Sequence, residues 1–369
     1  MSSKIAGQVS DFNPEEYFDK KDIKKLDIYT QFALVAAREA VKDANLTDDN
    51  YDSFRAGCII GAGIGGIWTF QEETAKFISK GPRRVSPFFI PKMISNIAAG
   101  HIAIEHKLKG INFNVSSACA SANHAIGTSL RAIQYGDADI IVSGGAEGAV
   151  NPMALAGFAA MKALSTRNDE PQKASRPFDK DRDGFVMGEG AGMIVMEELE
   201  HALARGAKIY AEIVGYGATC DAYHVTAPAD GGEGSARAID AALNEATLSP
   251  EQVDYFNAHG TSTPLNDKNE TAAIKTIFGA HTKDLAINST KSMVGHMLGA
   301  AAGVEAIVCC LSIRDSKIHA TINAETPDPN CDLNYTPNNP IERNVDIAIS
   351  NSLGFGGHNS AVIFKKYNK

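Results

Sequence analysis

The sequence lacks the features that mark several common classes of protein. Its six cysteines are scattered and form no CxxC pair, so their pattern predicts neither a zinc site nor a disulfide framework. The first residues contain no apolar stretch typical of a signal peptide, and no run is long enough to span a membrane. We therefore expect a cytoplasmic protein, kept in a reducing compartment, with no metal site.

An excess of positive charge and a complete nucleotide-binding motif are also missing. The formal net charge is −9, which argues against bulk binding to nucleic acid. A glycine-rich stretch at 61–66 resembles a phosphate-binding loop, but it has no Lys-Ser/Thr pair and no later acidic partner. We interpret this stretch as a backbone turn near an active site.

The pattern that is present is an alternation of strands and helices over 369 residues, enough for a large core and two structural halves. This alternation indicates the α/β class. The order of elements around Cys119 also resembles the order around His259, which suggests two similar halves. We predict helices at 30–45, 120–135, 235–246, 266–278 and 299–313. We predict strands at 57–61, 112–115, 138–145, 191–196, 209–216, 253–257, 286–288, 346–350 and 360–364.

The most informative segment surrounds Cys119, which lies where a predicted strand gives way to a predicted helix. Free N–H groups and the helix dipole at such a position favour the thiolate, which is the nucleophilic form of cysteine. Cys119 is therefore a candidate for covalent catalysis. The alternative is a small buried cysteine of the core, since free cysteine is often buried.

Further chemistry-bearing residues follow other predicted strands. His259 lies in NAHGTST, His296 in STKSMVGH, and Phe355 in the glycine-rich NSLGFGGHN. The loops that follow strands in α/β proteins are common positions for active sites. One such histidine alone is more often structural, but a cysteine and two histidines at three strand ends favour a joint site.

Together with the stretch 174–192, which reads SRPFD, RDGF and GEGAG, these segments resemble the β-ketoacyl-acyl-carrier-protein synthases of the thiolase superfamily. The resemblance covers nearly the whole chain from Phe12 onward and is strongest to the type II synthase of dissociated fatty-acid synthesis. It implies a thiolase-like layered αβαβα fold with two similar halves, 1–207 with the nucleophile and 208–369 with the histidines. It also implies a decarboxylative Claisen condensation that elongates an acyl chain.

The resemblance assigns catalytic roles to six residues. Cys119 would carry the acyl group as a thioester, and its N–H with that of Phe355 would form an oxyanion hole. His259 and His296 would hold the malonyl thioester carbonyl and stabilise the enolate that forms on loss of CO2. Lys291 would order the histidines, unless it is a surface lysine at a turn. Glu270 would support the site by pairing with Lys291 or a water, or would lie on a solvated helix face.

Substrate contacts are implied at five further residues. Thr261 and Thr263 would hydrogen-bond the pantetheine arm, although such hydroxyls also serve local turns and caps. Ile64, Phe89 and Phe158 would line the acyl pocket, with Ile64 limiting its depth; without the resemblance they would be ordinary core residues.

The implied partner is an acyl carrier protein, which is acidic and needs a positive patch on a negatively charged enzyme. Lys21, Lys24 and Lys25 in the densest basic run, together with Lys162, are the candidates, and a solvated helix face is the alternative. The resemblance also implies a homodimer that pairs through the first-half sheet, with Phe89 reaching the partner's pocket. No cofactor is expected, because decarboxylation generates the carbanion without one.

The sequence departs from the family at its beginning. Family members normally have a strand, a glycine-rich turn and a helix before the position of Phe12, so the resemblance implies a shortened first half. A polyketide-type ketosynthase and an inactive partner resembling a chain-length factor remain alternatives. A thiolase is disfavoured, since its second reactive cysteine has no counterpart among Phe355–His358.

Overall fold

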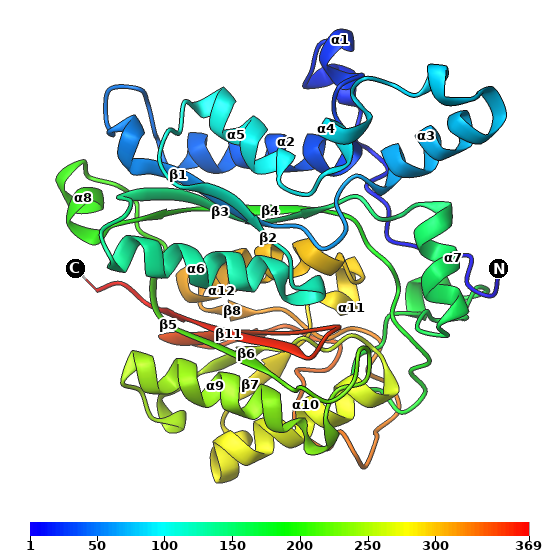
Figure 1. Ribbon diagram of the computed structural model, residues 1–369. Helices are drawn as coiled ribbons and strands as arrows, with labels where there is room; N and C mark the ends of the chain where they lie inside the picture. Colours follow the sequence, from blue (N-terminus) through cyan, green and yellow to red (C-terminus); the bar gives the residue numbers. More distant parts are fainter. Residues whose placement is uncertain (369) are drawn as a thin grey trace.

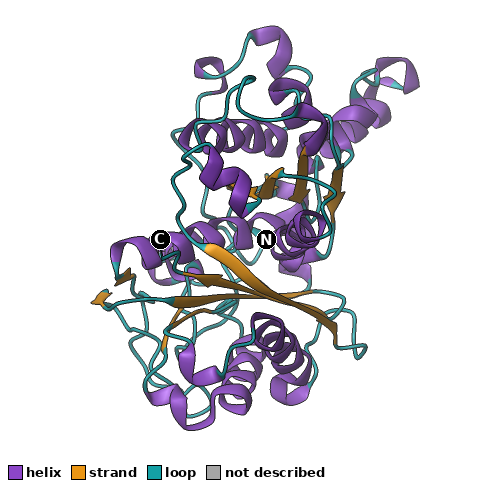
Figure 2. Ribbon diagram, turned by 90° about the vertical axis from the view of Figure 1, so that its left-hand side faces the viewer, coloured by secondary structure: helices purple, strands orange, loops and turns teal. Residues whose placement is uncertain are grey.

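The computed structural model describes residues 1–368, which form five stacked layers (Figure 1). Helices α1–α5 cover one sheet, helices α9 and α10 cover the other, and α6 and α12 lie between the two sheets. The view turned by 90° shows the two sheets and their helices again as separate halves (Figure 2). This is the layered αβαβα arrangement expected from the sequence.

The first half contains a four-stranded sheet in the order β2-β1-β3-β4. The first three strands are parallel and β4 is antiparallel to β3. All residues of β1 and β3 are buried, as expected for strands covered by helices on both faces. The elements are α1 (Lys20–Ile23), α2 (Ile28–Asp43), β1 (Ala56–Gly61), α3 (Ile67–Lys80), α4 (Phe89–Met93), α5 (Ile97–His106), β2 (Asn112–Val115), α6 (Ser121–Gln134), β3 (Ile140–Glu147), α7 (Pro152–Ala160), β4 (Gly190–Glu197) and α8 (Leu199–Ala204).

The second half contains a five-stranded sheet in the order β5-β11-β10-β6-β7. Its strands β7, β6 and β10 are parallel, and β11 runs antiparallel to both β10 and β5. The elements are β5 (Glu212–Cys220), α9 (Glu233–Ala246), β6 (Tyr255–Asn257), α10 (Pro264–Phe278), β7 (Ala286–Asn288), α11 (Lys291–Val294), α12 (Ala301–Asp315), β8 (Lys317–Ile318), β9 (Ile341–Glu342), β10 (Ile347–Gly354) and β11 (His358–Lys365).

The two sheets repeat one topology, with a single difference. In chain order, β1, β2, β3 and β4 of the first half occupy the places of β6, β7, β10 and β11 of the second. The second sheet has an additional edge strand, β5, beside β11, whereas β4 has no strand on its outer edge among residues 1–368. The predicted division after residue 207 falls in the segment 198–211 that joins the two sheets, and it stays a prediction.

The two central helices join the halves. Asn123 on α6 donates from its side-chain amide to the carbonyl oxygens of Ser350 and Ser360, at 3.0 and 3.2 Å. Its partners lie on β10 and β11, so a first-half helix is fixed to the second-half sheet. Within the described residues, no helix has the length and apolar character that crossing a bilayer requires.

Candidate active site

Cys119 lies at the joint between the halves. The chain leaves β2, forms a single 3-10 turn at Ala118–Ala120 and continues as α6. The last residue of β10, Gly354, lies directly against this turn, because a Cβ atom added there would be 2.5 Å from the carbonyl oxygen of Ser117. Glycine is required for this approach of two backbones. The nucleophile candidate of the first half therefore touches the glycine-rich loop of the second.

The backbone N–H groups of Phe355 and Cys119 lie near the sulfur of Cys119, and each of them lowers its pKa. Burial nevertheless raises the pKa of Cys119 to about 12, against the opposing effects of Lys291 and the two N–H groups. Our expectation that the helix N-terminus favours the thiolate is therefore wrong for the resting protein. The residue is only 9% exposed, and desolvation of the charged form outweighs the local dipole.

His259 and His296 meet beside this position. His259 follows β6 and His296 follows α11, and their ring centroids are 5.3 Å apart with the rings at 88°. Burial lowers the pKa of both histidines well below the usual value, and the nearby charge of Lys291 lowers it further. Both rings are therefore neutral near pH 7. A neutral imidazole offers one N–H donor, so the pair can present two donors to one carbonyl.

Lys291 links these groups by its charge. It is 1% exposed, and its Nζ atom donates to Oε1 of Glu305 at 2.5 Å. Its charge acts on the pKa of Cys119, His259 and His296 alike, which places all three around one buried cation. The alternative of a surface lysine at a turn is excluded.

Part of our expectation for Glu270 is wrong. It does not pair with Lys291, whose partner is Glu305, and it is not on a solvated face, since it is fully buried. Its carboxylate accepts the backbone N–H groups of His259 and Gly260 and the side-chain amide of Asn351, each at 2.7 Å. Glu270 thus fixes the turn that carries His259. Burial raises its pKa to about 7.

A second buried carboxylate, Glu147 at the end of β3, fixes the glycine-rich stretch 61–66. It accepts N–H groups from Gly63, Ile64 and Gly65, and another from Gly299 at 3.1 Å. These N–H groups are therefore occupied by a protein carboxylate, which agrees with our interpretation of the stretch as a turn. Burial raises the pKa of Glu147 to about 7.

The predicted pocket residues do not all lie together. Phe158 packs on the apolar cluster that contains Cys119, and its ring lies 5.4 Å from Phe185 and 6.4 Å from Phe355. The ring of Phe185 in turn lies 5.2 Å from that of His296. Ile64 is 38% exposed and Phe89 is half-buried, and neither belongs to this cluster.

The two threonines predicted to contact the pantetheine arm lie next to each other. Thr261 and Thr263 share a hydrogen bond of 2.9 Å between their hydroxyl oxygens.

The lysines predicted to dock the carrier protein lie on two separate parts of the surface. Lys21, Lys24 and Lys25 are exposed on and after α1, where Lys25 pairs with Asp22. Lys162 is exposed just after α7, well separated from α1 in Figure 1. The four lysines therefore do not form one patch within a single chain.

Sequence reasoning missed Glu305 and Glu147. A signal existed for each, because Glu305 interrupts the apolar helical run AAGVEAIVCC and Glu147 ends the apolar strand IIVSGGAE. A charged residue in a segment that is otherwise buried needs a partner. The sequence alone did not identify those partners.

The comparisons with known proteins agree with this geometry. A solved complex of a type II polyketide acyl-carrier protein with its ketosynthase contains a chain that superposes with a TM-score of 0.91 at 38% identity, covering 100% of this chain and 89% of that one. Proteins named 3-oxoacyl-acyl-carrier-protein synthase 2 are similar in sequence. The one from Staphylococcus aureus (strain N315) is 53% identical over 98% of this chain and 87% of its own length. The one from Synechocystis sp. is 50% identical over 100% of this chain and 88% of its own length.

Family models match both halves. The model described as "Beta-ketoacyl synthase, N-terminal domain" matches residues 1–202, and the one described as "Beta-ketoacyl synthase, C-terminal domain" matches residues 210–325. Cys119 lies in the first match, and His259 and His296 lie in the second. By sequence and by fold, the chain belongs to the β-ketoacyl synthase family.

Proposed function

We propose that this protein is an acyltransferase that condenses an acyl group, held on Cys119, with malonyl-acyl-carrier-protein to give 3-oxoacyl-acyl-carrier-protein. The observation that carries the proposal is the gathering of one thiol, two aimed N–H groups and two neutral imidazoles around buried Lys291. Each of these groups matches one requirement of the reaction.

In the first step, the sulfur of Cys119 attacks the acyl thioester of the carrier protein. The acyl carbon bonds to Cys119, the carrier's thiol leaves, and the proton of Cys119 passes to it. The N–H groups of Cys119 and Phe355 stabilise the oxyanion that forms, an effect of roughly 3 kcal/mol for one donor. Because the resting group is a thiol, its proton leaves as attack proceeds.

In the second step, malonyl-carrier-protein loses CO2 and its thioester becomes an enolate. The neutral rings of His259 and His296 donate hydrogen bonds to the enolate oxygen. The enolate carbon attacks the Cys119 thioester, the new carbon–carbon bond forms, and the released thiolate takes up a proton. Loss of CO2 supplies the carbanion, so we expect no cofactor.

The relatives support fatty-acid elongation as the pathway. Proteins named 3-oxoacyl-acyl-carrier-protein synthase 2 are 50% and 53% identical to this chain, whereas the ketosynthase of the polyketide complex is 38% identical. The same complex contains an acyl-carrier protein, which supports a carrier protein as the partner here.

We also propose a homodimer in the cytoplasm. The free edge of the first-half sheet opposite β4 is β2, where Asn112 and Phe113 are exposed. Unpaired strand edges of this kind can extend a sheet into a second copy. The six cysteines are all unpaired, which suits a reducing compartment.

The decisive experiment supplies purified protein with acyl- and malonyl-carrier-protein and follows both Cys119 and the products by mass spectrometry. We expect acyl-Cys119 with the acyl donor alone and the 3-oxo product when both are present. A protein that is never acylated at Cys119 would instead be an inactive partner, and acylation without product would refute the condensation.

A further inference from the structure

The two histidines of the site are held in place by different means. The carboxylate of Glu270 fixes the turn of His259. Within residues 1–368 no carboxylate bonds the backbone of His296. Its N–H donates to the carbonyl oxygen of Val186 at 2.7 Å, and its own carbonyl oxygen accepts the N–H of Gly188 at 2.9 Å. The backbone position of His296 therefore depends on the extended main chain that lies beside it.

The imidazole of His296 has no hydrogen bond that would set its direction from the Nδ1 side. This atom is buried and has no hydrogen-bond partner among residues 1–368. The rings of Phe185 and His259 flank the imidazole, with centroids 5.2 and 5.3 Å away. Contacts with rings limit the space of an imidazole, whereas a hydrogen bond also constrains its direction. The aim of the His296 donor thus follows the backbone that carries it.

A further piece of chain, residues 2–9, lies along the other edge of the main chain that holds His296. We call it the outer segment. Gly7 donates its N–H to the carbonyl oxygen of Met187 at 2.7 Å and accepts the N–H of Glu189 at 3.3 Å. These bonds form a parallel bridge, and a second parallel bridge joins Met187 to His296. Three pieces of main chain therefore lie side by side, with the outer segment and His296 on opposite edges of the middle one.

The three pieces meet main chain on main chain. A Cβ atom at Gly188 would be 2.7 Å from the carbonyl oxygen of Val294, so this contact requires glycine. A Cβ atom at Gly7 would be 3.1 Å from the same oxygen, so the outer segment also reaches the turn before His296 directly. Close-packed atoms transmit displacement. A shift of the outer segment should therefore move the backbone of His296.

The outer segment is itself fixed by the side chain of Asn168. The Oδ1 atom of Asn168 accepts the N–H of Lys4 at 2.7 Å, and its Nδ2 atom donates to the carbonyl oxygen of Ser2 at 2.8 Å. Ser3, between these two residues, is buried. The outer segment is therefore held by a specific partner as well as by its pairing at Gly7.

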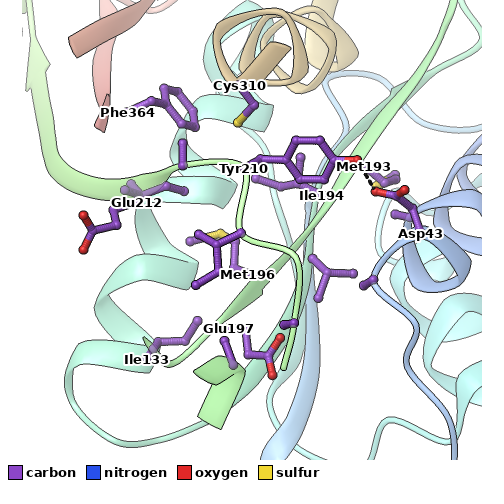
Figure 3. A pocket seen from close by; sticks show the side chains of 18 of the residues that line it. Asp43, Ile133, Met193, Ile194, Met196, Glu197, Tyr210, Glu212, Cys310 and Phe364 are labelled. Carbon is purple, nitrogen blue, oxygen red and sulfur yellow. Dashed lines mark hydrogen bonds between the residues drawn. The ribbon is translucent and has the colours of Figure 1, made fainter. Parts of the chain in front are cut away.

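The middle piece of main chain belongs to the first half. Residues 186–189 continue directly into β4, which pairs with β3 in the first-half sheet. Later side chains of β4, such as Met193, Ile194 and Met196, line a separate hollow (Figure 3). None of the groups that hold His296 lines that hollow. The contact thus joins a second-half histidine to the first-half sheet.

We propose that the outer segment is a positioning element for His296, so that decarboxylation depends on it and acylation of Cys119 does not. The inference rests on the proposed function, which places His296 at the enolate. Misplacing a catalytic group by about 1 Å can cost on the order of 10²-fold in rate. Acylation uses the main chain at Cys119 and Phe355, and neither residue hydrogen-bonds the outer segment within residues 1–368.

The first test enlarges Gly7, whose φ angle is not positive, so that alanine and valine suit its backbone. The added atoms press on the carbonyl oxygen of Val294. Gly7→Ala should lower kcat for decarboxylation about threefold and Gly7→Val about tenfold, with KM for malonyl-carrier-protein unchanged. Release of CO2 from malonyl-carrier-protein without an acyl donor measures this step. Gln8→Val, at the exposed neighbouring residue, is the matched control and should change neither constant.

The second test loosens the outer segment without adding bulk. Asn168→Ala removes both side-chain hydrogen bonds to it and should lower kcat for decarboxylation about threefold. Asp169→Ala, at the exposed neighbouring residue, should leave this rate unchanged. The rate of Cys119 acylation, followed by mass spectrometry, should be normal in every variant. Circular dichroism checks folding, and Asn168→Ala decides alone if Gly7→Val does not fold.

Three results would overturn the inference. The first is a normal decarboxylation rate in both Gly7→Val and Asn168→Ala. The second is an equal loss of decarboxylation and of Cys119 acylation, which would mean that the outer segment supports the fold as a whole. The third is a raised KM with an unchanged kcat, which would mean that it contacts the carrier protein. If the protein without substitutions released no CO2, the proposed function itself would be refuted, and the inference with it.

Discussion

The two halves share a strand order but differ in what they carry. The first half brings the thiol of Cys119 at the start of α6, and the second brings His259, His296, Lys291 and the N–H of Phe355. Neither half alone holds both a nucleophile and the donors for an enolate. The difference shows that the reaction depends on the contact between the halves, at Gly354 and the turn before α6.

Both halves use a buried carboxylate to fix the loop that follows one of their central strands. In the first, buried Glu147 accepts N–H groups of the loop after β1, and in the second, buried Glu270 accepts N–H groups of the loop after β6. Strands β1 and β6 occupy equivalent places in their sheets. Each half thus fixes its strand-end loop with a carboxylate, but only the second-half loop carries a histidine.

The largest expected effect separates the chemistry of the two halves. Cys119→Ala should lower condensation by about 10³-fold or more, because no other group carries the acyl chain. His259→Ala should lower decarboxylation by about 10²-fold while Cys119 still becomes acylated. Mass spectrometry of Cys119 and release of CO2 measure the two steps.

This division would be broken by either of two results. Full condensation by Cys119→Ala would mean that the first half does not supply the nucleophile. A normal decarboxylation rate in His259→Ala would mean that the second half does not hold the enolate. Cys119→Gln, which should keep decarboxylation, is the matched control.

The second-largest expected effect is a loss of stability when the buried ion pair between Lys291 and Glu305 is broken. Both residues belong to the second half. Lys291→Ala leaves the buried carboxylate of Glu305 without its partner, which should lower the free energy of unfolding by about 3 to 5 kcal/mol. Urea denaturation measures this loss. Lys291→Met combined with Glu305→Leu should recover most of the stability, but not the activity. If the free energy of unfolding of Lys291→Ala lay within about 1 kcal/mol of that of the unchanged protein, the ion pair would not have the expected importance for stability.

The matched carboxylates predict equal pH dependence in the two halves. Glu147 and Glu270 have pKa values of about 7 in the folded protein, raised by burial from 4.5. Protonation thus favours the folded state, so this contribution is full below pH 4.5 and is lost as pH rises through 7. It amounts to about 3 kcal/mol for each group.

Urea titrations between pH 5 and pH 8 test this prediction. Glu147→Gln and Glu270→Gln should each remove about half of the fall in unfolding free energy over this range. Glu72→Gln, an exposed control on α3, should leave the fall unchanged. A fall that persists in both buried variants would place the titrating groups elsewhere.

The smallest effect compares two surfaces of the first half. Replacing Lys21 on α1 and Lys24 just after it with glutamate should raise KM for the carrier protein about three- to tenfold with kcat unchanged, because exposed charges mainly steer association. Lys162→Glu, at the separate surface after α7, should have a smaller effect. Steady-state kinetics at low and high salt measure both, and a larger effect at Lys162 would move the docking surface to α7.

Much of the fold could be predicted because its strands are short, apolar and bounded by small residues. The predicted strands at 112–115 and 286–288 have the observed bounds. We predict no element between 66 and 112, where α3, α4 and α5 lie. Exposed apolar side chains on α3, such as Phe77 and Ile78, obscure its helical pattern.

The site was predictable in its residues but not in its contacts. The motifs placed Cys119, His259, His296 and Lys291 near one another, and the structure brings them together. The partner of Lys291 and the net effect on the Cys119 pKa depend on burial by segments far away in sequence. The rule that a helix N-terminus lowers the pKa of a nearby thiol therefore predicted the wrong direction for the pKa of Cys119.

The contact at Gly354 also has a consequence for how the enzyme could be redesigned. Because main chain meets main chain there, the spacing between the two backbone N–H donors, those of Cys119 and Phe355, is set by strand position and not by any rotamer. Changes to nearby side chains can reshape the acyl pocket, but they have no means of tuning this spacing. New substrate ranges should therefore be accessible by mutation more readily than new geometries of attack.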